Sequence, residues 1–264
     1  MTQIIAVANQ KGGVGKTTTS VNLAACLSAT KRRVLLVDLD PQGNATMGSG
    51  VDKNAVAATG CEVLLGERSV AEVVVAAIPA GYAIVPANSD LTAAEVELMT
   101  HAESEKRLKA ALEPIKAEYE YVLIDCPPAL NMLTLNALVA AQGVIIPMQC
   151  EYYALEGLTA LLDTIEKIRT TLNFELRIEG LLRTMYDPRN NLANDVSAQL
   201  LEHFPERVFN TIIPRNVRLA EAPSHGLPAI LYDRTSQGAR AYLALAGEML
   251  RREAKEQVPE PEPA

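Results

Sequence analysis

A glycine-rich loop near the start of the chain limits the possible folds more than any other feature. The apolar run at residues 4–8 predicts a buried strand, and a helical pattern covers residues 17–29. Between them lies the loop Asn9-Gln10-Lys11-Gly12-Gly13-Val14-Gly15-Lys16-Thr17-Thr18. Glycines let a backbone wrap closely around phosphate oxygens, and the N–H groups at a helix start attract anions. The order of strand, loop and helix therefore predicts a phosphate-binding loop.

The residues of this loop have separate expected roles. Gly15-Lys16-Thr17 matches the end of the pattern G-x-x-x-x-G-K-[ST], whereas Gln10 stands where the pattern has its first glycine. We expect Lys16 to bridge the terminal phosphates of ATP and the Thr17 hydroxyl to bind Mg²⁺. The residues expected to contact the nucleotide here are Lys11, Gly12, Gly13, Val14, Gly15, Lys16, Thr17 and Thr18.

Two further strands end in carboxylates. Residues 34–38 form an apolar run that ends in Asp38, and Asp40 follows in a loop that contains Pro41 and Gly43. Residues 121–125 form a second run that ends in Asp125. We expect Asp125 to hold Mg²⁺ through water, because Mg²⁺ keeps part of its hydration shell, and Asp38 to lie near the ion.

Short apolar runs alternate along the chain with helix-length amphipathic segments, which predicts parallel βαβ units. The candidate strands are residues 4–8, 34–38, 83–86, 121–125, 143–147, 178–185 and 208–213. Right-handed crossovers on a mainly parallel sheet give a three-layer α/β/α fold, with ligands at the carboxyl ends of the strands. We expect one domain over residues 1–252 and a disordered, acidic, proline-rich tail over residues 253–264.

Composition limits the location and the class of partner. The N-terminus lacks the features of a signal peptide and no run is long enough to span a membrane, so we expect a cytoplasmic protein without a membrane partner. Four scattered cysteines are expected to be reduced, packed thiols. The net charge is −8, but residues 183–240 contain seven arginines, no lysine and six acidic residues. This segment is a candidate for contact with an anionic partner.

The loop resembles the deviant Walker A box of a known group of P-loop ATPases. The string from Lys11 to Thr18 is similar to that of ParA/Soj, MinD, the nitrogenase iron protein and the arsenite-pump ATPases. The resemblance implies that Lys11 reaches across an ATP-sandwiched dimer to the partner's phosphates, beside the catalytic Lys16. It also implies that Asp40 orients the attacking water.

Three strings beyond the loop resemble the ParA/Soj chromosome-partition ATPases in particular. They are residues 38–46, 149–157 and 213–226. The resemblance covers about residues 2–250 and implies an ATP hydrolase that forms an ATP-dependent homodimer. It further implies non-specific binding of double-stranded DNA, stimulation by a ParB/Spo0J-type partner, segregation of chromosome or plasmid DNA, and association with the nucleoid. Ten residues before Lys11 leave no room for a helix-turn-helix, so sequence-specific operator binding is not expected.

The same resemblance suggests residue roles in the arginine-rich segment. Arg189 and Arg218 match positions that contact the DNA backbone, with Arg215 as a neighbour; the planar guanidinium suits phosphate oxygens. Pro214 and Asn216 match positions that pack against adenine and hydrogen-bond to it.

Two other loops have less specific expected roles. Glu151 and Tyr152 are expected on the dimer face, and His225 is expected to be structural or capping.

Three other readings stay open on the sequence. A MinD-like membrane ATPase needs a basic amphipathic C-terminal helix, but this chain ends in Pro-Glu repeats. A reductase like the nitrogenase iron protein needs cluster-binding cysteines; Cys126 lies beside the loop after residue 125, but without flanking glycines. A ligase or kinase such as dethiobiotin synthetase shares the fold, but the arginine-rich string at residues 214–218 disfavours it.

Overall fold

A seven-stranded sheet runs through the part of the chain that the computed structural model describes, residues 2–152 and 154–256. The strands are β1 (Gln3–Val7), β2 (Val34–Asp38), β3 (Val75–Ala77), β4 (Tyr82–Val85), β5 (Tyr121–Asp125), β6 (Gly143–Gln149) and β7 (Arg177–Thr184). Their order across the sheet is β3-β4-β2-β5-β1-β6-β7. All neighbouring strands are parallel except β3, which is antiparallel to β4.

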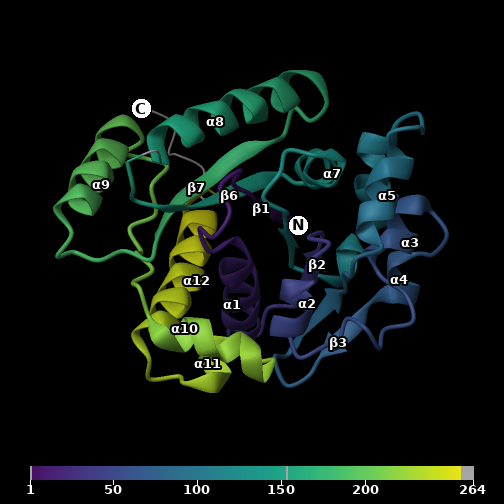
Figure 1. The fold of residues 1–264 in the computed structure, drawn as a ribbon, viewed down its shortest axis with the longest axis horizontal. Coiled ribbons are helices and arrows are strands. Elements are labelled where there is room, and N and C mark those ends of the chain that lie inside the picture. Colours follow the sequence, from purple (N-terminus) through teal and green to yellow (C-terminus); the bar gives the residue numbers. More distant parts are fainter. Residues whose placement is uncertain (1, 153, 257–264) are drawn as a thin grey trace, which may run out of the picture.

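Helices cover both faces of this sheet (Figure 1). They are α1 (Lys16–Ala29), α2 (Asn44–Gly48), α3 (Gly60–Leu65), α4 (Val70–Val73), α5 (Leu91–Leu98), α6 (Arg107–Leu112), α7 (Met132–Ala140), α8 (Ala154–Thr171), α9 (Asn191–His203), α10 (Val217–Glu221), α11 (Ala229–Tyr232) and α12 (Gln237–Glu256), with 3₁₀ turns η1 (Ser104–Lys106), η2 (Lys116–Glu118) and η3 (Ala222–His225). One core cluster joins the sheet to α3–α9, and a second joins it to α1, α2 and α10–α12.

The central strands are buried on both faces, as their continuous apolar sequences predict. Every residue of β2 and β5 is buried. The core is largely aliphatic, since the chain has no tryptophan and three phenylalanines. The predicted three-layer α/β/α fold with a mainly parallel sheet is confirmed. It places the carboxyl ends of β1, β2 and β5 side by side, because β5 pairs with both β1 and β2.

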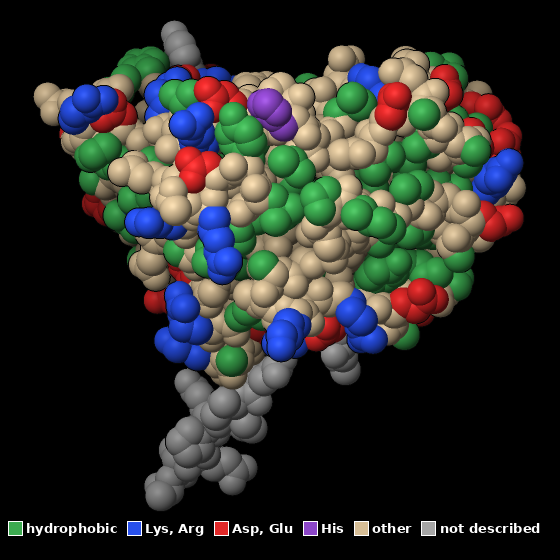
Figure 2. Space-filling model, turned by 90° about the horizontal axis from the view of Figure 1, so that it is seen from below, with side chains coloured by type: hydrophobic (Ala, Val, Ile, Leu, Met, Phe, Trp, Pro, Cys, Tyr) green, Lys and Arg blue, Asp and Glu red, His purple; other side chains and the backbone are tan. Residues whose placement is uncertain are grey.

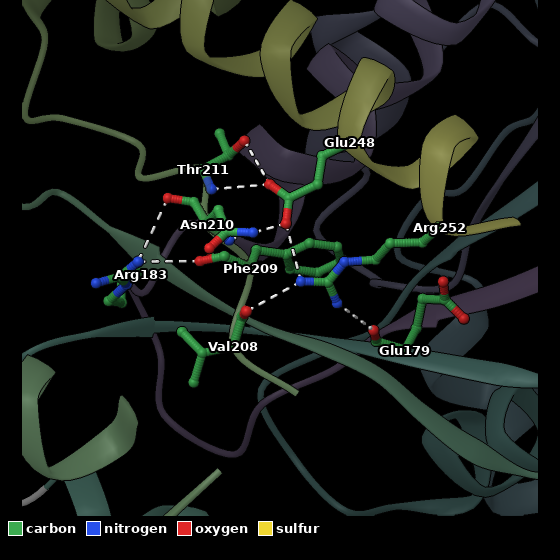
Figure 3. Close-up of polar contacts among 8 residues, drawn as sticks. All are labelled: Glu179, Arg183, Val208, Phe209, Asn210, Thr211, Glu248 and Arg252. Carbon is green, nitrogen blue, oxygen red and sulfur yellow. Dashed lines mark hydrogen bonds and ion pairs between the residues drawn. The ribbon is translucent and has the colours of Figure 1, made fainter. Parts of the chain in front are cut away.

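The predicted strand at residues 208–213 is wrong. Near both of its ends the segment exchanges backbone hydrogen bonds with β7 and the residues just after it, but the pairing amounts to isolated parallel bridges, Leu181 with Val208 and, just beyond the segment, Tyr186 with Pro214. The middle of the segment is held by Glu248 of α12, whose carboxylate accepts hydrogen bonds from the N–H groups of Asn210 and Thr211, both at 2.8 Å (Figure 3). An apolar run predicts extended backbone, but not whether a strand or a side chain will satisfy its N–H groups.

A compact polar network holds α12 to this segment. Besides the two N–H groups, the Glu248 carboxylate accepts from the Thr211 hydroxyl at 2.7 Å and from the Arg252 guanidinium at 2.8 Å. The Arg252 guanidinium also donates to the Val208 carbonyl at 2.9 Å and lies 4.4 Å from the ring centroid of Phe209 (Figure 3). The segment that leads into α10 is therefore fixed from the C-terminal helix.

Replacing Glu248 by glutamine is expected to lower the free energy of unfolding by about 2–4 kcal/mol at neutral pH, because two backbone N–H groups and Arg252 lose a charged acceptor. Burial alone would raise the pKa of Glu248, but hydrogen bonds from Thr211 and Asn210 and the charge of Arg252 outweigh it and lower the pKa. Because the pKa of Glu248 is lower in the folded than in the unfolded chain, the ionised carboxylate stabilises the fold. This stabilisation is fully present when the pH is above the unfolded-state pKa, and it is lost as the pH falls through the folded-state pKa.

The difference in the free energy of unfolding between wild type and Glu248→Gln should therefore be largest above about pH 5 and shrink below about pH 4. Urea unfolding followed by circular dichroism across this range measures it. The exposed Glu202→Gln on α9 serves as the control, with no change expected. A Glu248→Gln variant as stable as wild type at pH 7 would contradict this account of the network.

The end of the described chain differs in detail from the expected boundary. Helix α12 continues to Glu256, so residues 253–256 belong to a helix and not to the expected tail. Residues 257–264 lie outside the described residues, and the disordered tail stays a prediction there. Among the helices that the structure does describe, none combines the length and the apolar character needed to cross a bilayer.

Candidate functional site

The phosphate-binding loop joins β1 to α1, as its sequence predicts. Gly15 stands at the N-cap of α1 with φ of 88°, a left-handed conformation that favours glycine. A Cβ added at Gly12 or Gly13 would meet no atom within 4 Å, so this stretch of backbone borders open space. The Thr184 hydroxyl, at the end of β7, donates to the Val14 carbonyl at 2.8 Å and ties the loop to the sheet.

Lys16 lies in the loop's cavity with 7% of its surface exposed. Its ammonium donates to the Lys11 carbonyl at 3.2 Å. Burial lowers the pKa of Lys16, and the nearby charges of Asp125 and Asp40 act in the opposite direction. The structure thus brings the predicted cation and two of the predicted carboxylates together.

Asp38 and Asp125 are neighbours across β2 and β5, and both are fully buried. The Asp38 carboxylate accepts from the Thr46 N–H at 2.8 Å, the Thr46 hydroxyl at 2.7 Å and the Asp40 N–H at 3.1 Å. Asp125 accepts from the Ser20 hydroxyl at 2.8 Å. Burial raises the pKa of both carboxyl groups, and repulsion among Asp38, Asp40 and Asp125 raises it further.

These groups fit a divalent cation. The Asp125 Oδ2 atom is buried without a hydrogen-bond partner, and the Thr17 hydroxyl lies close enough to lower the pKa of this carboxyl by hydrogen bonding. Across residues 2–152 and 154–256, no three His, Cys, Asp or Glu side chains cluster as a metal site. A magnesium ion here would be held by Thr17, by Asp125 and by the oxygens of the phosphates themselves. Asp38 would contribute mainly charge, since both its oxygens already accept hydrogen bonds.

Asp40 lies in the loop after β2, with 8% of its surface exposed, and it lines the cavity. Its Oδ1 accepts from the Gln42 N–H at 2.9 Å, and its carbonyl accepts from the Gly43 N–H at 2.8 Å. The carboxylate is therefore fixed by the backbone of its own loop. It is placed where a carboxylate could accept a proton or orient a water molecule beside bound phosphates.

The cavity has a volume of about 430 Å³, and its lining combines two chemically different sets of residues. One set is the phosphate loop with Asp40, and the other comprises Met185, Ile213, Pro214, Arg215, Asn216, Leu219, Ala220 and Tyr242. Pro214 and Asn216 thus border the cavity as the resemblance implies, although the Asn216 side chain also caps α10 by accepting from the Arg218 N–H at 3.1 Å. A lining that combines a polar set and a largely apolar set suits a triphosphate and a base.

Sequence reasoning missed several residues at this cavity. Thr184 is the last residue of β7, and Met185, which follows it, adopts a φ of 48°. The rule that ligands lie at the carboxyl ends of parallel strands could have found this pair. Tyr242 of α12 gave no local signal, because its place beside Thr19, at 3.1 Å between the hydroxyls, depends on the packing of two helices distant in sequence.

Lys11 does not line the cavity of its own chain. Its ammonium forms an ion pair with Glu151 at 2.5 Å, and each of the two side chains is 44% exposed. Tyr152, the residue after Glu151, is 73% exposed. The pair leaves the Lys11 side chain on the surface, where a second molecule could reach it.

His225 stacks on Tyr232 with 4.9 Å between the ring centroids, which fits a structural role.

The three predicted DNA-contact arginines differ in their partners. Arg189 forms a two-pronged pair with Asp187, at 2.9 and 2.8 Å, which lowers the pKa of Asp187 to about 2. Arg215 adds to that lowering of the Asp187 pKa, so it lies near the pair. Arg218 of α10 pairs with Glu221 at 2.7 Å and with Asp233 at 3.4 Å. All three side chains are exposed.

The surface beneath α10 and α11 is mixed in character. Figure 2, which views the molecule from below, shows Lys and Arg side chains spread among hydrophobic and acidic ones. No single block of positive charge dominates this view. Contact with a polyanion would therefore depend on individual arginines and on the number of copies that bind together.

Comparison with known proteins places this geometry among related chains. A family model described as "AAA domain" matches residues 2–178. The chain is 64% identical to an "Uncharacterized protein" of Pseudomonas putida over 96% of both chains. It is 52% identical to "Sporulation initiation inhibitor protein Soj" of Bacillus subtilis, over 94% of this chain and 98% of that one. It is 51% identical to "Chromosome partitioning protein ParA" of Myxococcus xanthus, over 95% of this chain and 89% of that one.

The fold is also similar to a solved structure, that of cobyrinic acid a,c-diamide synthase from Mycobacterium smegmatis with bound ATP analogue and magnesium. It superposes with a TM-score of 0.85 and 38% identity, over 97% of this chain and 98% of that one. That structure holds a nucleotide and magnesium in the same fold. The similarity therefore supports use of both ligands by chains of this architecture.

Proposed function

This chain belongs to the ParA/Soj family of chromosome-partitioning ATPases, and from that premise we propose that it is an ATP-driven switch for DNA attachment. ATP binding joins two copies into a sandwich dimer, and the dimer binds double-stranded DNA without sequence preference. Hydrolysis, stimulated by a ParB/Spo0J-type partner, then releases the DNA. Such a cycle would place the protein on the nucleoid and segregate chromosome or plasmid DNA.

One observation carries this proposal. The cavity lined by the phosphate loop is also lined by the arginine-bearing segment, including Arg215 and the α10 residues Leu219 and Ala220. Arg218 lies on the same short helix. A nucleotide in this cavity would therefore touch the element that carries the proposed DNA contacts, so nucleotide state can influence DNA binding directly.

The chemistry assigned to the site is phosphoryl transfer to water. Backbone N–H groups of the loop and the Lys16 ammonium bind the phosphates, and Asp40 orients a water molecule for in-line attack on the terminal phosphorus. The bond from that phosphorus to the bridging oxygen breaks, which yields ADP and phosphate. Magnesium, when bound by Thr17 and Asp125, neutralises charge on the phosphate oxygens.

Lys11 is proposed to act on the other subunit's nucleotide. Its side chain lies outside its own cavity and pairs with Glu151 on the surface. A second copy that presents its phosphates to Lys11 would replace an exposed ion pair, which contributes little, with contact to a highly charged anion. Because each chain supplies a cation to the other, dimerisation and ATP binding become linked.

DNA binding measured without nucleotide, with ADP and with ATP tests this function. We expect binding to a non-specific duplex only with ATP and magnesium, and weaker binding as the salt concentration rises, because phosphate contacts release counterions. Fluorescence anisotropy of a labelled duplex and analytical ultracentrifugation report DNA binding and dimerisation in parallel. Binding that is equal in all three nucleotide states would refute the switch.

Arg218→Glu is expected to weaken ATP-dependent DNA binding by at least about tenfold while leaving ATP affinity within about twofold, because it replaces a phosphate-binding cation with an anion. Arg169→Glu is the matched control, since Arg169 is also exposed and pairs with a glutamate three residues away. It lies on α8 and should bind DNA as wild type does. Unchanged binding by Arg218→Glu at the same salt concentration would show that this surface is not the DNA contact.

The similarity to the M. smegmatis synthase raises a second candidate, an ATP-dependent amide-forming enzyme. Such an enzyme must hold a carboxylate substrate beside the terminal phosphate and has no need for DNA. The relatives at 51–52% identity are instead a chromosome partitioning protein and a Soj protein. The measurement above separates the two, because only the partition switch predicts DNA binding that requires ATP.

A further inference from the structure

The Asp40 carboxylate takes its position from the backbone that follows it. Its Oδ1 accepts from the Gln42 N–H at 2.9 Å, while its carbonyl accepts from the Gly43 N–H at 2.8 Å. The peptide unit between Gln42 and Gly43 therefore helps to hold Asp40 in place. The carboxylate itself is bound by the Gln42 N–H, so a group that fixes the Gln42 carbonyl restrains the same residue whose N–H orients the carboxylate.

Two neighbours hold that peptide unit. Gly43 adopts a φ of 60°, and a Cβ added there would lie 2.6 Å from the Ala87 carbonyl oxygen and 2.8 Å from the Lys53 Cδ. The aliphatic stem of Lys53 thus packs directly on the Gly43 backbone, and no side chain fits between them. The Lys53 ammonium donates to the Gln42 carbonyl at 2.6 Å.

Lys53 reaches the Asp40 loop because the chain turns back after α2. The Val51 N–H donates to the Thr46 carbonyl at 3.2 Å at the end of that helix. Asp52 then closes a turn by accepting from the Asn54 N–H at 2.9 Å. This turn brings Lys53 back to Gln42, so the Lys53 side chain joins the two ends of the segment at residues 42–53.

We propose that Lys53 is a positioning residue for hydrolysis, whose ammonium clamps the Gln42–Gly43 peptide and thereby orients the Asp40 carboxylate. The inference rests on the proposed role of Asp40 in orienting water. A cation on the Gln42 carbonyl polarises the peptide unit and strengthens the hydrogen bond that the Gly43 N–H gives to Asp40. Lys53 does not line the nucleotide cavity, so its effect falls on turnover and not on nucleotide binding.

The test compares variants of the full chain. Lys53→Met keeps an apolar stem over Gly43 but removes the ammonium, and Lys53→Arg restores a cationic donor. Lys167→Met, at an exposed lysine of α8, is the control for loss of one positive charge. Asp40→Ala, alone and combined with Lys53→Met, shows whether the two residues act through the same step.

We expect Lys53→Met to lower basal kcat for ATP hydrolysis by about fivefold to tenfold with KM and the ATP dissociation constant within about twofold, since a slightly misplaced group costs rate and not affinity. Lys53→Arg should recover at least half of the wild-type rate, and Lys167→Met should match wild type. Lys53→Met added to Asp40→Ala should cause no further loss.

Three results overturn the proposal. One is a wild-type kcat in Lys53→Met. Another is a parallel fall of kcat, ATP affinity and melting temperature without recovery in Lys53→Arg, which would mark a merely structural lysine. The third is a further loss of rate when both substitutions are combined. Normal hydrolysis by Asp40→Ala alone would instead refute the role of Asp40, whereas an inactive Asp40→Ala beside a fully active Lys53→Met refutes only the clamp.

Discussion

Lys16→Ala is expected to weaken ATP binding by at least about a hundredfold, and this loss follows from the charge balance of the cavity. Lys16 is almost fully buried beside the acidic side chains Asp40 and Asp125, with Asp38 next to Asp125. Without the ammonium, a triphosphate would enter a site whose remaining side-chain charges repel it. Loop N–H groups could still donate hydrogen bonds, but they would not balance that repulsion.

Isothermal titration with ATP and magnesium measures this effect, and circular dichroism checks that the variant is folded. Lys16→Arg keeps a cation but changes its shape, so it should recover part of the affinity and little of the hydrolysis. Lys167→Ala on α8 is the surface control. An Lys16→Ala variant that binds ATP within about threefold of wild type would show that Lys16 is not the main phosphate cation.

The parts of the fold that could be predicted depend on local sequence. Strands β2 and β5 are buried on both faces, and such strands appear in sequence as unbroken apolar runs. The phosphate loop was equally predictable, since glycine spacing and the following lysine directly determine the backbone shape and the charge. Because parallel strands bring their carboxyl ends together, the meeting of Lys16, Asp40 and Asp125 followed from the same pattern.

Features set by distant contacts could not be predicted. Residues 208–213 look like a strand, but in the middle of the segment Glu248 of α12 supplies the acceptors that a neighbouring strand would otherwise provide. The ion pair between Lys11 and Glu151 joins residues 140 positions apart. The pairs of Arg189 with Asp187 and of Arg218 with Glu221 are different, because the partners lie two and three positions apart and local sequence could have indicated them.

These pairings bear on how the proposed DNA contact would work. Each of Arg189 and Arg218 has its positive charge partly balanced by an adjacent carboxylate. A single chain would then attract DNA weakly, and the doubled set in a dimer would bind more strongly through multivalency. The overall charge of −8 acts in the same direction, because it disfavours DNA contact by the monomer.

Asp40→Ala is expected to lower the rate of ATP hydrolysis by about a hundredfold or more, since a positioned carboxylate near the attacking water contributes roughly that much. ATP affinity should stay within about threefold of wild type, because Lys16 and the loop N–H groups remain. If hydrolysis ends the DNA-bound state, this variant should also stay dimeric and bound to DNA for longer than wild type. Stopped-flow release of labelled DNA after addition of excess competitor measures that lifetime.

The combination of a lost rate with a prolonged bound state is what separates a water-orienting residue from a phosphate-binding one. Lys16→Ala should lose ATP and DNA binding together, whereas Asp40→Ala should lose only the exit from the bound state. Asp163→Ala, at an exposed aspartate of α8, controls for the loss of one carboxylate. Turnover at the wild-type rate in Asp40→Ala would remove Asp40 from the reaction and, with it, the link between this loop and release of DNA.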